Sequence, residues 1–185
     1  MGDPTTIRRL YGRRQAFKLR DLQQQRVEGL LPQISVPLEG PLDSQILFGD
    51  ARALELEIGF GKGEHLAWQA AVDTQNLANV RIHAGDALEV LERLAPASLR
   101  RVYLLHPDPW PKARHAKRRF VNPGPLDLIA RALMPGGEFR LATDHPIYMR
   151  WAVMQMVKRQ DFEWLVEKPS DWEGRPADWP ATRYG

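Results

Sequence analysis

The stretch Leu54-Glu55-Leu56-Glu57-Ile58-Gly59-Phe60-Gly61-Lys62-Gly63-Glu64 decides the fold class. Apolar residues alternate up to Ile58 and glycines then recur at every second position, so the stretch predicts a strand, a tight turn and the start of a helix. Such a turn allows positive φ and lets a ligand approach the backbone. It is neither a Walker A loop nor a full G-x-G-x-x-G motif. A plain strand–helix connection is the alternative, but the acid Glu57 at the strand end favours a binding site.

Strands and helices alternate along the rest of the chain. The patterns predict strands at 52–58, 80–84, 101–105, 138–142 and 162–167, and helices at 21–31, 64–71, 87–94, 125–133 and 145–159. Pro135-Gly136-Gly137 is expected to end the fourth helix. This alternation predicts an α/β fold with a doubly wound, mostly parallel sheet. We expect residues 1–50 to form a basic arm and a helix, and residues 51–185 to form a single domain with an irregular end from residue 170.

The composition excludes several classes of protein. The 185 residues are 43% hydrophobic and 26% charged, which is ordinary for a soluble globular domain. The chain has no cysteine, so disulfides, thiol nucleophiles and Cys-bound zinc are excluded, and its five histidines lack metal-ligand spacing. The N-terminus lacks the apolar core of a signal peptide, and no apolar run reaches membrane-spanning length. The net charge is only +3, but the basic residues cluster, which favours a nucleic-acid partner.

The segment PDPWPKARHAKRR, residues 107–119, combines one acid with a run of cations. It follows an apolar strand, so Asp108 lies just past a strand end on backbone that Pro107 and Pro109 restrict. Ligands of open α/β sheets bind at such ends. The cations suit a polyanion, and the rigid acid and the aromatic residue at the head of the run favour this interpretation over a merely solvated basic loop. Trp110 either stacks on a base or packs against the scaffold.

Together these features resemble the bacterial tRNA (guanine-N7-)-methyltransferase family, which uses S-adenosyl-L-methionine. The resemblance covers most of the chain, and its motifs lie at residues 8–15, 56–64, 79–81, 85–87, 107–119, 142–144 and 182–184. The 107–119 segment is specific to the family, whereas the glycine turn is shared by many methyltransferases. The resemblance implies a class I, Rossmann-like methyltransferase fold and a cytoplasmic enzyme that methylates N7 of the variable-loop guanine of tRNA. Family members occur as monomers and as homodimers.

The resemblance also implies roles for individual residues. Asp108 is the expected catalytic residue, because a carboxylate can hold the base and stabilise the positive charge that N7 methylation leaves on it. The expected cofactor-binding residues are Glu57, Gly59, Gly61, Gly63, Asp86 and Asp108. The expected tRNA-binding residues are Lys112, Arg114, His115, Lys117, Arg118, Arg119, Asp144, Thr182, Arg183 and Tyr184. Asp144 could equally be a helix N-cap, and Asp86 a plain turn residue.

The sequence departs from the family in two places. Members usually have a further strand and helix before Asn79, including an acid that holds the cofactor ribose. That segment is absent near residues 70–72, and the chain stops at Gly185 before the family's last strand. We expect omitted residues at both places, because a natural deletion would expose strand edges.

Two other functions remain open. If the internal deletion is natural, we expect a catalytically silent tRNA-binding relative, because the ribose-anchoring acid would be lost. A nucleotide-dependent oxidoreductase would explain the glycine turn but not the segment 107–119.

Overall fold

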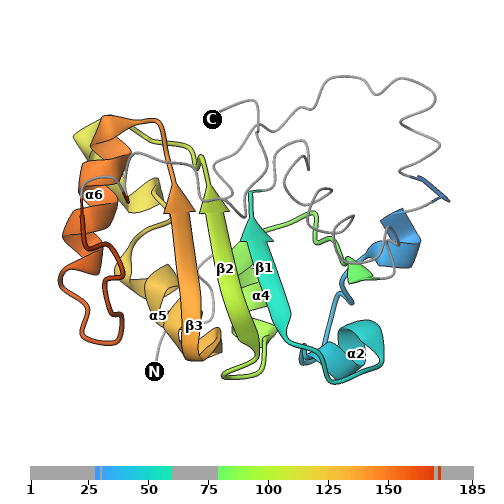
Figure 1. The fold of residues 1–185 in the computed structure, drawn as a ribbon. Coiled ribbons are helices and arrows are strands. Elements are labelled where there is room, and N and C mark those ends of the chain that lie inside the picture. Colours follow the sequence, from blue (N-terminus) through green and yellow to red (C-terminus); the bar gives the residue numbers. More distant parts are fainter. Residues whose placement is uncertain (1–27, 30, 60–78, 169–170, 172–185) are drawn as a thin grey trace, which may run out of the picture.

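The structure is a computed structural model that describes residues 28–29, 31–59, 79–168 and 171 (Figure 1). Several predictions concern residues outside these ranges. They are the basic arm, most of the helix at 21–31, the helix at 64–71, the gap near 70–72 and nearly all of the irregular end from residue 170.

Three parallel strands form the described sheet, in the order β1-β2-β3 (Figure 1). They are β1 (Leu54–Ile58), β2 (Leu99–Leu105) and β3 (Leu133–Ala142). Ile58 pairs with Leu104 and Leu104 with Leu141, so the carboxyl ends of all three strands meet at one edge. The predicted α/β class with a parallel sheet is therefore confirmed.

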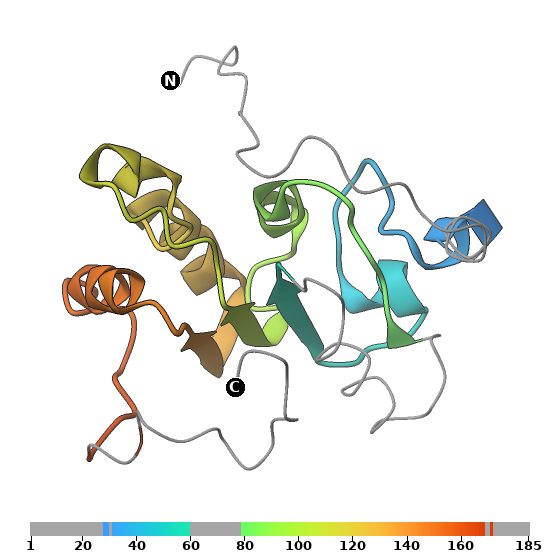
Figure 2. The same ribbon diagram turned by 90° about the horizontal axis from the view of Figure 1, so that it is seen from above.

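Helices α4 (Ala87–Arg93) and α5 (Pro123–Ala132) lie together on one face of the sheet (Figure 2). Helix α6 (Pro146–Met156) lies beside β3, and the short α2 (Ser44–Phe48) lies beyond β1. Leu126, Ile129 and Ala132 recur at helical spacing and are buried, which explains how α5 packs on the sheet. The helices predicted at 87–94, 125–133 and 145–159 are thus confirmed, with their ends shifted by a few residues.

The hydrophobic core joins the sheet to the segment before it. Val102 and Leu104 of β2 are buried in one cluster with Leu42 and Val36. The Leu42 N–H also donates to the Arg93 carbonyl at 2.9 Å. The described part of the first 50 residues therefore packs against the sheet and α4, and the predicted domain boundary at residue 51 stays a prediction.

Two predicted strands are wrong. Of residues 80–84, only Ile82 pairs, through an isolated parallel bridge to Ser35. Residues 162–167 form no strand, and Leu165 is 70% exposed. Both segments have apolar residues at strand spacing, but a strand also needs a neighbouring strand to satisfy its backbone. The sequence analysis also missed α2 and the 3₁₀ helix η2 (Ala113–Arg118).

Pro135-Gly136-Gly137 does not end α5, because the helix already ends at Ala132 and β3 begins at Leu133. The pairing with β2 jumps from Leu99–Leu133 to Arg101–Glu138, so the residues between them form an irregularity within β3. A Cβ on Gly137 would lie 2.9 Å from the Met134 carbonyl and 3.1 Å from the Arg100 carbonyl. Only glycine fits there without a shift of backbone, and regular pairing resumes at Glu138.

An ionic network crosses the three strands. Arg101 of β2 lies between two acids, 3.5 Å from Glu55 Oε1 and 3.1 Å from Glu138 Oε2. Arg140 Nε lies 2.7 Å from the same Glu138 oxygen. Burial alone would raise the pKa of Glu138, but hydrogen bonds from Arg140 and Arg101 outweigh it and lower the pKa. The network therefore stabilises the ionised carboxylate.

Candidate active site

The ends of the three strands bring candidate residues to one edge of the sheet. Gly59 follows β1, Asp108 lies three residues past β2, and Asp144 lies two residues past β3. The His106 N–H donates to the Ala142 carbonyl at 2.8 Å, and His106 Nδ1 lies 3.8 Å from Asp144 Oδ1. The loops that carry Asp108 and Asp144 are thus tied together, as expected for a ligand site at this edge.

Asp108 is exposed on a strained turn. It lies between two prolines, and the residues just outside them, His106 and Trp110, have φ of +47° and +41°. A residue other than glycine in this left-handed region costs about 1–3 kcal/mol and persists only where its surroundings hold it. Such strain clusters at functional sites, so the backbone supports the assignment of Asp108 to the site.

The residues expected to bind the cofactor are only partly within the described structure. Gly59 has φ +74°, a conformation that favours glycine, and among the described residues no atom lies within 4 Å of a Cβ added there. Glu57 is half-buried in β1. Asp86 is the N-cap of α4, where Oδ1 accepts a 3.0 Å hydrogen bond from the Leu88 N–H. Gly61 and Gly63 lie outside the described residues.

Residues 112–119, which we call the basic lobe, continue from the Asp108 turn and contain η2. Lys112, Arg114 and Lys117 are exposed. The Arg118 guanidinium lies 4.9 Å from the centre of the Trp110 ring, and the His115 ring meets that ring edge-on at 5.7 Å. These contacts favour packing against the scaffold as the role of Trp110. The exposed cations give the lobe a surface suited to a polyanion.

The surroundings of His115 within this lobe favour its neutral form. Desolvation, and then the charges of Arg118, Arg114 and Lys112, lower the pKa of His115 below its ordinary value of 6.5. A neutral imidazole can still donate one hydrogen bond. The positive charge of the lobe at neutral pH therefore comes from lysine and arginine.

Arg119 differs from the other cations of the lobe because it is only 5% exposed. Its Nε donates to the Pro109 carbonyl at 3.1 Å and its Nη2 to the Trp110 carbonyl at 3.0 Å. Its guanidinium also lies 4.8 Å from the centre of the Trp151 ring. The side chain is thus engaged by protein groups, and nothing in the structure tests the tRNA contact expected from the sequence.

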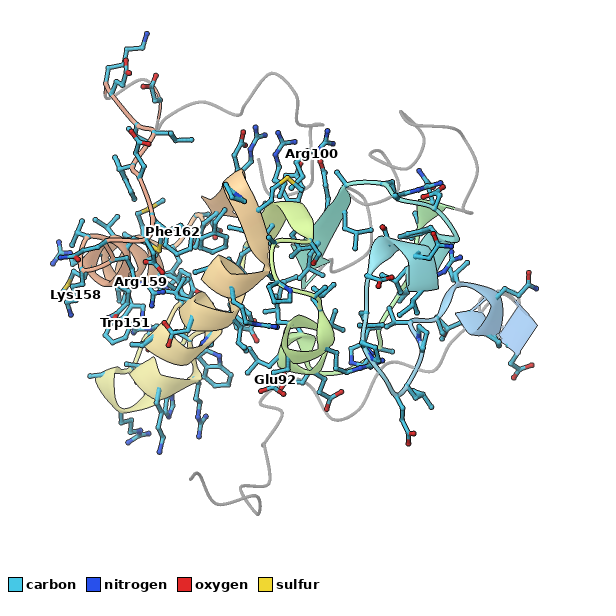
Figure 3. All side chains as sticks on the ribbon, turned by 90° about the horizontal axis from the view of Figure 1, so that it is seen from below. Glu92, Arg100, Trp151, Lys158, Arg159 and Phe162 are labelled. Carbon is cyan, nitrogen blue, oxygen red and sulfur yellow. The ribbon has the colours of Figure 1, made fainter. Side chains whose placement is uncertain are left out.

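Two side chains of α6 bind the peptide that follows the basic lobe. The Val121 N–H donates to the Tyr148 hydroxyl at 3.3 Å, and Trp151 Nε1 donates to the Val121 carbonyl at 2.7 Å. Trp151 lies on the side of α6 that faces α5 (Figure 3). Burial raises the pKa of Tyr148 to about 12. The sequence analysis missed these two hydrogen bonds to Val121. The only signal for them in the sequence is that Tyr148 and Trp151 are spaced to lie on one face of the helix.

Comparison with known proteins identifies the family. A family model described as "Putative methyltransferase" matches residues 67–185, more than half of the chain. A tRNA (guanine-N(7)-)-methyltransferase from Zymomonas mobilis is 54% identical over 205 residues, which cover 98% of this chain and 89% of the relative. This chain belongs to the tRNA (guanine-N7-)-methyltransferase family.

Other members of the family give the same result. The relative from Erythrobacter litoralis is 52% identical over 207 residues, with 99% of this chain and 89% of the relative covered. The relative from Rhodospirillum rubrum is 40% identical over 210 residues, with 98% and 82% covered. The resemblance inferred from the motifs is therefore confirmed.

The match also bears on the absent segment. It extends over 205 residues, whereas this chain has 185, so at least 20 residues of the Zymomonas mobilis relative have no counterpart here. The comparison does not locate these residues along the chain, and the predicted gap near residues 70–72 lies outside the described structure. The expected site residues Thr182, Arg183 and Tyr184 also lie outside it.

The part of the chain that the structure describes contains no helix that is long and apolar enough to cross a membrane. Those same residues include no group of three His, Asp or Glu side chains suited to a metal ion.

Proposed function

We propose that this protein methylates N7 of guanine in tRNA, with S-adenosyl-L-methionine as the methyl donor. Membership of the family supports the reaction class. The observation that carries the proposal within this chain is the exposed Asp108 on its strained turn, next to the cations of the basic lobe. The Asp108 turn thus offers a carboxylate to the guanine base, and the basic lobe that follows it offers cations to the tRNA phosphates.

The cofactor-binding residues fit a ligand that approaches the backbone closely. Gly59 at the end of β1 has φ +74°, which favours glycine, and Glu57 and Asp86 offer carboxylates to an amino group, hydroxyls or an adenine. We assign the same role to Gly61 and Gly63. When bound, S-adenosyl-L-methionine supplies a methyl group already activated by a sulfonium. The full class I, doubly wound arrangement is part of this proposal.

Asp108 performs the chemistry that this reaction asks of the protein. Guanine N7 carries a free lone pair, so no base has to remove a proton before the methyl group arrives. The product is a positively charged purine, and a carboxylate at its N–H edge both holds the base and stabilises the developing charge. The tie between His106 and Ala142 brings Asp144 to the same edge, where it would line the substrate side.

The basic lobe positions the tRNA. Exposed Lys112, Arg114 and Lys117 would contact phosphates, which fix the register of the RNA without reading its sequence. Arg118, His115 and the C-terminal residues Thr182, Arg183 and Tyr184 complete the proposed tRNA-binding set. A cytoplasmic location and a monomer or homodimer remain predictions.

Mass spectrometry of digested tRNA tests the proposal. Wild-type protein, labelled cofactor and a tRNA transcript should give N7-methylguanosine, and a transcript with adenine in place of the variable-loop guanine should give none. Calorimetric titration with the cofactor tests the rival function. A silent tRNA-binding relative would bind the tRNA, but it would not bind the cofactor and would not transfer a methyl group.

A further inference from the structure

We propose that Arg119 is a positioning residue that holds the Asp108 turn, and that it is not a phosphate ligand. The inference rests on the proposed function, because the turn carries the proposed catalytic acid. It separates Arg119 from its neighbour Arg118, from which the sequence alone does not distinguish it.

The geometry of Arg119 fits a tie across the turn. Its Nε and Nη2 donate to the carbonyls of Pro109 and Trp110, the two residues that follow Asp108. A guanidinium is a planar fork with donors in fixed directions, so one side chain can hold two successive carbonyls. Lysine cannot reproduce this, because an ammonium group is a point charge on a flexible stem.

The far side of Arg119 is held by rigid elements. Its guanidinium stacks on Trp151 of α6, and the Trp151 indole N–H holds the Val121 carbonyl. The Arg119 N–H donates to the Ala116 carbonyl of η2 at 3.1 Å. Arg119 therefore connects the strained turn to a helix, which is the support that a preorganised catalytic group requires.

The burial of Arg119 argues against a phosphate contact. A buried cation is costly unless its donors are satisfied, and here two carbonyls and an aromatic face satisfy it. No carboxylate forms an ion pair with Arg119 among the described residues. The Arg119 Nε and Nη2 already donate to carbonyls, whereas Lys112, Arg114 and Lys117 are exposed and open to a phosphate.

The test compares Arg119→Gln and Arg119→Lys with the phosphate-ligand control Lys117→Gln. Single-turnover methyl transfer is measured at saturating tRNA and cofactor, and the tRNA Kd is measured at several salt concentrations. We expect both Arg119 variants to slow the saturated rate by about tenfold or more, because small displacements of a reacting group are costly. Their salt dependence should stay that of wild type, while Lys117→Gln should weaken binding and flatten the slope by up to about 0.9.

A second measurement does not depend on activity. Trypsin should cleave after Lys112 and Arg114 faster in Arg119→Lys than in wild type at equal thermal stability, because the turn and lobe lose their tie. If wild type transferred no methyl group to tRNA, the proposed function would fail, and the protease result would still decide the role of Arg119.

Two results would overturn the inference. One is a higher tRNA Kd with a flatter salt slope and an unchanged saturated rate in the Arg119 variants, which is the signature of a phosphate ligand. The other is a wild-type rate of trypsin cleavage in Arg119→Lys. If Arg119→Gln does not fold, Arg119→Lys, which keeps the charge, supplies all three readouts.

Discussion

The main-chain N–H of His106 donates a 2.8 Å hydrogen bond to the carbonyl of Ala142. This bond joins the first residue past β2 to the last residue of β3, so the loops with Asp108 and Asp144 start from one fixed point. The backbone of His106 has φ +47° at this bond. The edge of the sheet therefore presents two acids from separate strands on backbone that the fold constrains.

Substitutions at His106 test this constraint. Asparagine tolerates the left-handed region, whereas a β-branched side chain does not. We expect His106→Val to lower the free energy of unfolding by about 1–3 kcal/mol more than His106→Asn does. Urea denaturation followed by circular dichroism measures the difference. Equal stabilities for the two variants would mean that the backbone at His106 is not strained.

Gly137 tests the irregularity within β3. A Cβ there would meet two backbone carbonyls, so Gly137→Ala should destabilise the protein by about 1–3 kcal/mol. Gly29 is the matched control, because it is helical and exposed, and no described atom lies within 4 Å of a Cβ added there. Gly29→Ala should stabilise by about 0.4–1 kcal/mol. Thermal unfolding of both variants checks the opposite signs, and a tolerated alanine at 137 would refute the close approach.

Tyr148 predicts a specific alkaline response. Its pKa is about 12 in the folded protein against an ordinary 10.0, so the folded state favours the protonated phenol. That contribution is fully present below pH 10 and is lost as the pH rises through 12. Between these values the free energy of unfolding of wild type should fall more steeply than that of Tyr148→Phe, by up to about 1.4 kcal/mol per pH unit. Parallel curves from pH 9 to 12 would contradict the assignment.

Glu138 predicts an acid response of the opposite sense. Its pKa lies below its ordinary value of 4.5 in the folded protein, so its contribution to stability is present above 4.5 and is lost as the pH falls through the folded value. Glu138→Gln should therefore lose less stability than wild type on acidification. The urea midpoints of both proteins, measured from pH 7 to pH 3, check this prediction. If wild type and Glu138→Gln lost the same stability on acidification, the ionic network would not stabilise the Glu138 carboxylate.

The elements that could be predicted from the sequence carry strong local signals. The strand Leu54–Ile58 alternates and ends at glycines, and the helix at 87–93 begins at the N-cap Asp86. The helix α2 has similar signals in Asp43 and Gly49, but five residues are too few for a periodic pattern. The strand predictions at 80–84 and 162–167 were wrong, because strand pairing depends on a partner strand that the local sequence pattern does not reveal.

The candidate site was partly predictable, because some of its residues also carry strong local signals. The Pro-Asp-Pro sequence after an apolar strand predicts a rigidly held acid at the sheet edge, and Asp108 is exposed there in the structure. Arg118 and Arg119 are identical residues in one cationic run, yet one stacks on Trp110 and the other on Trp151. That difference depends on α6, about thirty residues away, and composition or spacing cannot report it.

Single-turnover methyl transfer by Asp108→Asn tests the central claim most directly. Asp127→Asn is the control, because Asp127 lies exposed on α5 and pairs with Arg159. With tRNA and S-adenosyl-L-methionine saturating, wild type and Asp127→Asn should form N7-methylguanosine at similar rates, and Asp108→Asn should be about 10²–10³ slower with its tRNA affinity retained. A rate for Asp108→Asn within about threefold of wild type, a difference under 0.7 kcal/mol, would contradict the account.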